Sequence, residues 1–185
     1  MNSQNVTAGK PAISGAIYRA PLGSTLPTTA DGELDEAFKQ LGYVSDSGLV
    51  NSNTPETSDV KAWGGDIVLS TQSQKKDTFK FQLIEALNVE VLKTIYGDDN
   101  VSGTLDTGIT VKANATEAQE SVYAVDMIMK GGVLKRIVIP SAKLTSLGDV
   151  SYTDSAQVGY DVTITAYPDS SGQTHYEYMK KKATA

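Results

Sequence analysis

The sequence predicts a mainly β protein, a sandwich or barrel of strands with one helix at its flank. Two segments, 78–87 and 158–167, alternate apolar and polar residues, as strands with one buried face do. Only 89–96 combines helical spacing with capping residues, Asn88 before it and Gly97 after it. Turn-forming Gly, Pro, Asn and Asp punctuate the rest of the chain. One clear helix among many strands favours a sandwich or barrel.

The first third of the chain has weaker signals. Residues 1–11 are polar and small, which is typical of an N-terminal arm, and 12–20 could form a first strand. Residues 34–41 place apolar side chains at i, i+3, i+4 and i+7, so a short helical turn is expected there, ended by Gly42. Residues 43–50 predict a weak strand.

A long polar stretch follows. Residues 51–59 are almost free of apolar side chains and predict the centre of a long loop, about 46–66. Long ordered loops are uncommon in compact domains and are often functional. Trp63, the only tryptophan, lies at the far end of this loop and is either a buried anchor or an interface residue. Strand 67–71 should then be joined to 78–87 by a polar turn.

The C-terminal half is rich in predicted strands. Residues 121–130 and 133–139 form a hairpin across a Gly-Gly pair, and Pro140 ends the second strand. Residues 173–179 pair back on the preceding strand after a Pro- and Gly-containing turn. The basic segment that follows, 180–185, is expected to be a flexible tail.

Length and composition narrow the function. The 185 residues fit a single domain, placed at 12–179 between the N-terminal arm and the tail. The 16 basic and 22 acidic residues give a formal charge of −6, which argues against a protein that wraps or reads DNA. The absence of cysteine excludes disulfides and thiolate metal sites. No segment resembles a signal peptide or a membrane span, so the protein is expected to be made and used inside a cell.

Motifs for catalysis or metal binding are incomplete. Residues 98–103 begin like a calcium-binding loop, but the twelfth position, which should be Glu, is Ile109. His175 is the only histidine, and no nucleophile elbow accompanies it. No phosphate-binding glycine loop is present. The sequence therefore predicts no catalytic, cofactor-binding or metal-ligating residue, and no enzyme.

Several runs of sequence together resemble one family. In order, they are 7–11, 15–18, 41–45, 61–66, 79–85, 91–97, 130–140 and 160–169. At this spacing the chain resembles the major tail tube proteins of siphophages and related prophages, over about residues 6–179. The resemblance implies two antiparallel sheets packed face to face with one flanking α-helix and a long loop, similar to the tube protein of type VI secretion systems.

The resemblance also implies an assembly. Subunits would form hexameric rings whose strands join into a continuous inner barrel, and the rings would stack into a conduit for DNA ejection. The expected partners are other copies of the chain, the tape measure, the tail terminator, and baseplate or distal tail proteins. Double-stranded DNA would pass through the lumen without specific binding. The expected location is the virion tail, assembled in the host bacterial cytoplasm, with no membrane contact.

Two sets of residues are candidates for roles in this assembly. The loop would contact other subunits and stack the rings through Asn51, Asn53, Pro55, Glu56, Asp59 and Trp63. The acidic candidates for the lumen interrupt or end apolar strands, and they are Asp77, Glu85 and Asp126. Six copies at −6 each would repel phosphate and let DNA slide.

Three other functions stay open on sequence alone. A β-sandwich carbohydrate-binding or adhesin module shares the strand content, although it usually lines its site with several aromatic residues. A hydrolase using carboxylates would need a pocket with perturbed acids. A phage tail terminator or completion protein is the third alternative, and self-polymerisation would distinguish the repeated tube subunit from it.

Overall fold

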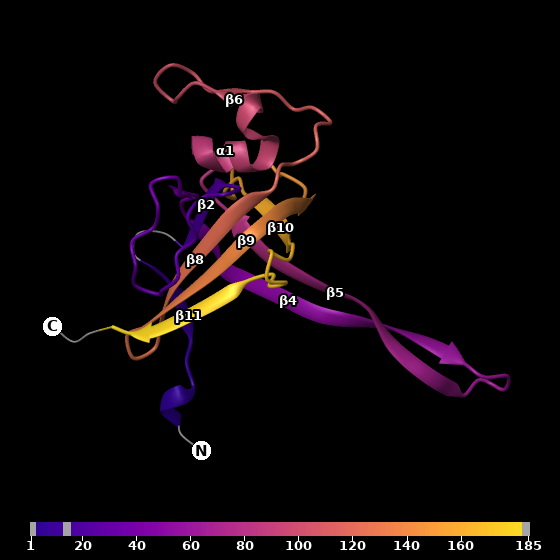
Figure 1. The fold of residues 1–185 in the computed structure, drawn as a ribbon. Coiled ribbons are helices and arrows are strands. Elements are labelled where there is room, and N and C mark those ends of the chain that lie inside the picture. The colour runs from indigo at the N-terminus through magenta and orange to yellow at the C-terminus, as the bar shows by residue number, and fades with distance from the viewer. Residues whose placement is uncertain (1–2, 13–15, 183–185) are drawn as a thin grey trace.

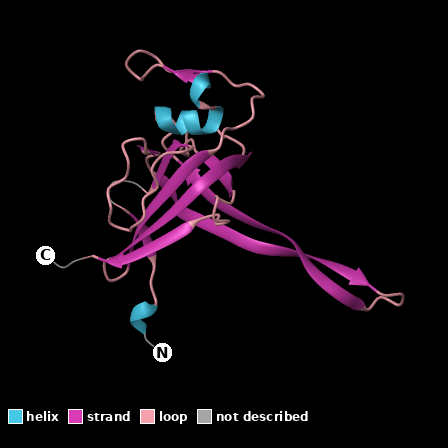
Figure 2. Cartoon of the chain, in the orientation of Figure 1, coloured by secondary structure: helices cyan, strands magenta, loops and turns pink. Residues whose placement is uncertain are grey.

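A computed structural model describes residues 3–12 and 16–182 of the chain. The described part is mainly β and contains two antiparallel sheets, with one α-helix lying at the end of the strands (Figure 1, Figure 2). These findings confirm the predicted fold class of a mainly β protein with two antiparallel sheets and a flanking helix. Over the residues described, the sheets do not close into a barrel.

Nine strands form the larger sheet, in the order β3-β2-β8-β9-β10-β5-β4, with β1 paired to β8 and β11 to β9. The strands are β1 (Gly9–Pro11), β2 (Ile17–Pro21), β3 (Lys39–Gln40), β4 (Val44–Lys61), β5 (Ile67–Leu83), β8 (Ser121–Met129), β9 (Val133–Leu147), β10 (Tyr160–Ala166) and β11 (Tyr176–Lys181). The smaller sheet pairs β6 (Val101–Ser102) with β7 (Thr110–Val111). Two short 3-10 turns, Ser3–Asn5 and Asp98–Asn100, complete the described elements.

Strand β9 belongs to two layers of the larger sheet. Its first part pairs with β8 and β11, and its last part, from Ala142 to Leu147, pairs with β10. Ile17 and Val125 of the first layer share one core with Phe79 and Ile164 of the second. The sheet therefore folds over so that its two halves pack face to face.

A second, smaller core covers the outer face of β2 and β8. Segment 22–38 lies over this face, and Phe38 packs there against Val122 and Ala124. The predicted helix at 34–41 is wrong, because the segment contains turns and strand β3. Phe38 enters this outer core whereas Leu41 enters the main core, and one helical face could not supply both.

The predicted helix at 89–96 is confirmed as α1 (Val89–Tyr96). Asn88 caps it, because its side-chain oxygen accepts a hydrogen bond from the Glu90 amide at 3.0 Å. Gly97, at a φ of 95°, ends it by donating its amide to Lys93 O at 2.8 Å. Val91 is fully buried and fixes the helix on the main core.

The sequence predicts a loop at 51–59, a turn at 72–77 and a strand end at Pro140, and all three predictions are wrong. β4 and β5 run through 51–59 and 72–77 as one long antiparallel hairpin. Pro140 lies within β9 and not at its end. The β8–β9 register shifts there, and such a bulge tolerates a residue without an N–H.

Both ends of the chain extend the sheet where they are described. Residues 9–11 of the expected N-terminal arm form β1, and β11 runs through Lys181, two residues into the expected tail. β11 pairs with β9 and not with β10, its predicted partner. Residues 1–2, 13–15 and 183–185, which belong to the predicted arm, first strand and tail, lie outside the described residues.

Candidate assembly surface

The most prominent exposed feature is a hairpin arm, defined as residues 54–76 of β4 and β5. β5 pairs with β10 only from Asp77 onward, and beyond that point it pairs with β4 alone. The hairpin arm projects far from the rest of the molecule (Figure 1), and all its residues are exposed. A two-stranded hairpin is at best marginally stable in water, and its free edges offer unpaired backbone groups. Such an arm is typical of an element that another chain covers.

Polar side chains form the stem of the hairpin arm. Gln74 donates to Glu56 at 2.5 Å, and Ser70 donates to Asp59 at 2.6 Å, so neighbouring strands are joined by side chains as well as by backbone. Lys75 and Lys76 add positive charge near the base of the stem. The polar stem can therefore stay in contact with water without another chain covering it.

Apolar side chains gather at the tip of the hairpin arm, in contrast to its stem. The side chains with more than half of their surface exposed there are Val60, Trp63, Ile67, Val68 and Leu69. Trp63 is fully exposed in the tip turn, so it is not a buried anchor within its own chain. Exposed apolar patches mark interaction sites, and tryptophan is enriched among residues that dominate binding energy.

Asp77 holds the root of the hairpin arm. Its carboxylate is 2% exposed, and Asn51 Nδ2 donates to Oδ1 at 2.7 Å. The hydroxyl of Thr174 donates to Oδ2 at 2.6 Å, and Nδ1 of His175 lies 2.6 Å from the same oxygen. His175 also packs edge-on against Phe79, with ring centroids 5.4 Å apart. β4, β5 and the segment before β11 thus meet at one carboxylate, which fixes the direction in which the arm leaves the body.

The six predicted contact residues are spread along this element. Asn51 lies at the root, Trp63 at the tip, and Asn53, Pro55, Glu56 and Asp59 on β4 between them. Their assignment to contacts between subunits stays a prediction.

The two root partners Thr174 and His175 were missed by sequence reasoning. The only sequence signal for the root was Asp77 itself, because a carboxylate on the buried face of an alternating strand needs hydrogen-bond partners.

The three acidic residues predicted for the lumen all make contacts within the chain. Asp77 is buried as described, and Glu85 accepts hydrogen bonds from the Tyr43 amide at 2.8 Å and the Asn88 amide group at 2.9 Å. Asp126 accepts two bonds from Arg136, at 2.6 and 2.8 Å. Their place in a lumen stays a prediction, but none is a free carboxylate in the described chain.

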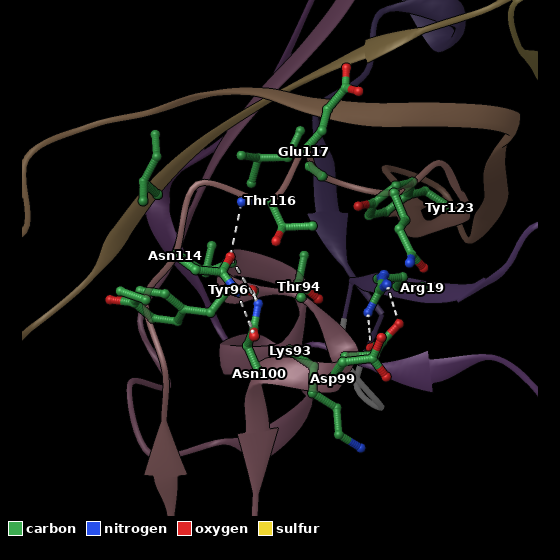
Figure 3. A pocket seen from close by; sticks show the side chains of 18 residues that line it. Arg19, Lys93, Thr94, Tyr96, Asp99, Asn100, Asn114, Thr116, Glu117 and Tyr123 are labelled. Atoms are coloured by element: carbon green, nitrogen blue, oxygen red, sulfur yellow. Dashed lines mark hydrogen bonds and ion pairs between the residues drawn. The ribbon is translucent and has the colours of Figure 1, made fainter.

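A cavity of about 490 Å³ lies between α1, the turn after it and residues 113–119 (Figure 3). Arg19 donates two hydrogen bonds of 2.8 Å to Asp98, and these hold the pKa of Asp98 below its usual value. Beside them, burial raises the pKa of Tyr123 to about 12. Asn114 donates to Asn100 at 2.9 Å. The polar groups satisfy one another, so the contacts serve to hold the surrounding segments together.

Other kinds of site find little support in the described residues. Within 3–12 and 16–182, no group of three or more His, Asp or Glu side chains is arranged to hold a metal ion. Over the same residues, no helix is long and apolar enough to cross a bilayer.

A mainly β protein whose main exposed feature is a hairpin with an apolar tip has the features of a class of proteins that work by binding other proteins through an exposed surface. The family model described as phage tail tube protein matches residues 1–185, the whole chain. The chain therefore belongs to the phage tail tube protein family. A search of curated proteins found no match. Membership makes the protein a structural component of the bacteriophage tail that assembles with itself and with other tail components.

Proposed function

We propose that this chain is the repeated subunit of the tail tube, forming hexameric rings that stack into a conduit for DNA ejection. The hairpin arm is the observation that carries the proposal, because a free-standing ribbon with an apolar tip needs a neighbour. The subunits assemble in the host bacterial cytoplasm, next to a tape measure, a tail terminator and baseplate or distal tail proteins. The protein is not an enzyme, and DNA passes through the lumen without specific binding.

The second layer of the sheet supports ring formation. In the order β9-β10-β5-β4, this layer has a free edge at each side within the described residues. β4 pairs with β5 alone, and Lys143–Leu147 of β9 pair with β10 alone. Exposed edges are aggregation-prone unless another strand covers them. Pairing one edge with the opposite edge of a neighbour is a heterologous contact, and such contacts close into rings when the rotation allows.

A shortened hairpin tests this function. Joining Pro55 to Lys75 through a two-residue Asn-Gly turn removes the tip and most of the stem, and keeps β5 paired in the body. We expect a folded monomer, seen by circular dichroism, and no rings or tubes by negative-stain electron microscopy and light scattering. Full-length tubes from this variant would contradict the proposal.

The same experiment separates the tube subunit from its nearest alternative. A tail terminator caps a tube once, so the intact chain would give single rings that never stack. Stacked hollow rings from the intact chain are expected for the repeated subunit. A deletion of residues 51–59 alone is a poorer test, because it would strip β5 of its partner strand.

A further inference from the structure

We propose that copies of this chain dock end to end through opposite charges, with four lysines at one end of the body facing four aspartates at the other end of the next copy. The lysine end comprises Lys10, Lys130, Lys181 and Lys182. The acidic end comprises Asp99, Asp106, Asp149 and Asp154. This inference rests on the proposed self-assembly, but it involves surfaces other than the hairpin arm.

Backbone pairing brings the four lysines together. Lys10 lies in β1, which pairs with the last residues of β8, and Lys130 follows β8 directly. The Lys130 amide donates to Ala8 O at 3.2 Å, and the Lys182 amide donates to Gly132 O at 2.9 Å. All four side chains are exposed, and none makes an ion pair within residues 3–12 and 16–182. The neighbouring Lys135 and Lys180 are already paired, with Glu177 and Asp31.

The acidic end lies around α1. Residues 85–120 contain seven Asp and Glu residues and two lysines, so this segment alone has a formal charge of −5. Asp99 follows α1, Asp106 lies between β6 and β7, and Asp149 and Asp154 lie in the segment between β9 and β10. These four side chains are exposed and carry no ion pair within the described residues. Leu105 and Gln157 border one hollow together with Ala86, which places the three segments side by side.

Strand β8 separates the two ends. It starts at Ser121, just after the acidic segment, and ends at Met129, next to Lys130. Nine residues of strand span roughly 30 Å at about 3.3 Å each. Figure 1 shows α1 at one end of β8 and β9, and the β8–β9 turn with the end of β11 at the other. The Debye length is about 8 Å at physiological ionic strength, so the two ends of one copy do not neutralise each other.

A second copy is the occupant that fits both surfaces at once. The lysine end needs an anionic partner and the acidic end needs a cationic one, and each copy offers both. The two patches differ and lie at opposite ends, so their contact is heterologous and extends in one direction. Charge complementarity of this kind sets orientation and speeds encounter more than it adds affinity. Nucleic acid would satisfy the lysine end alone and would leave the aspartates unpartnered.

Charge reversal tests the inference on the full chain. Lys181→Glu with Lys182→Glu is expected to slow assembly about tenfold or more at low salt, because steered association depends on such charges. The matched control is Lys39→Glu with Lys80→Glu, which changes the net charge equally but lies outside both the lysine end and the acidic end. We expect the control to assemble at the wild-type rate. Adding Asp99→Lys and Asp106→Lys to the first variant should restore assembly, because it restores complementarity with the signs exchanged.

Assembly is followed by light scattering and electron microscopy, and the fold of each variant is checked by circular dichroism. Where no variant polymerises, the second virial coefficient from static light scattering replaces the rate. It should be more repulsive for Lys181→Glu/Lys182→Glu than for the control at low salt, and equal at high salt. A complete absence of rings and tubes would count against the proposed function, whereas this charge dependence would still stand.

Three outcomes would overturn the end-to-end contact. The first is equal assembly of the lysine variant and its control, and the second is failure of the exchanged variant to recover. The third is a lysine variant that assembles normally but loses binding to double-stranded DNA, since the lysine end would then be a nucleic-acid surface.

Discussion

The two halves of strand β5 behave differently although they belong to one continuous strand. Phe79, Phe81 and Leu83 are at most 2% exposed, whereas every residue from Ile67 to Lys76 is exposed. The buried half has β10 beside it and a second layer across from it, and the exposed half has only β4. Burial in this chain therefore depends on neighbouring strands. The outer half of β5 is exposed in the single chain, and in the proposed tube another copy covers it.

The largest expected effect on stability comes from the buried half. Phe79→Ala should lower the free energy of unfolding by about 3–5 kcal/mol, because it removes a fully buried aromatic ring and leaves a cavity. Urea denaturation measures this loss. Val68→Ala, in the exposed half of the same strand, is the control and should change the free energy by less than about 0.5 kcal/mol. Equal losses in the two variants would remove the distinction between the halves.

The root of the hairpin arm should show an intermediate effect. Asp77→Ala removes the buried carboxylate that Asn51, Thr174 and His175 share as an acceptor. Each hydrogen bond contributes about 0.5–1.5 kcal/mol net, so a loss of about 1–3 kcal/mol is expected. The same denaturation measurement applies, with Asp59→Ala as the exposed control on the stem. The variant should also assemble poorly, because the arm loses its fixed direction. Normal stability of Asp77→Ala would show that the root contacts are dispensable.

The Arg19–Asp98 pair predicts a smaller, pH-dependent effect. Hydrogen bonds from Arg19 lower the pKa of Asp98, so its contribution is present above the unfolded pKa of about 3.9 and is lost as the pH falls through the lower, folded pKa. The Asp98 side chain is 47% exposed, so Asp98→Asn should cost only about 0.5–1 kcal/mol at pH 7. Thermal melts should show this difference narrowing toward pH 2. A difference that grows on acidification would contradict the assignment, and Asp99→Asn is the unpaired control.

The smallest effect on stability, with a large effect on assembly, is expected at the tip. Trp63→Ala should leave the free energy of unfolding unchanged within about 0.5 kcal/mol, because the side chain contacts no core. It should nevertheless reduce ring or tube formation, measured by light scattering against Tyr43→Ala, an exposed aromatic on the body. Unimpaired assembly of Trp63→Ala would show that the contact between copies does not depend on the tip.

Local signals in the sequence predicted part of this structure correctly. The helix 89–96 was predictable because Asn88, Gly97 and the apolar spacing all act within a few residues. The core faces of 79–83 and 160–166 were predictable because each strand buries one side and alternates accordingly. The polar character of 51–59 was equally clear, and it correctly indicated that the segment lies outside the core.

Tertiary structure alone decided what that polar segment forms. Residues 51–59 have no apolar face, so their strand conformation comes from pairing with residues 70–79, and no local pattern reports such a partner. In the same way, Pro140 is accommodated in β9 because the register shifts opposite it, and the residues near 34–41 divide between two cores. The sequence by itself determined the strand-rich class, the helix and the buried faces, because these follow from contacts close along the chain. The hairpin arm, its root at Asp77 and the separation of charge between the two ends depend on residues far apart in sequence, and only the folded chain brings them together.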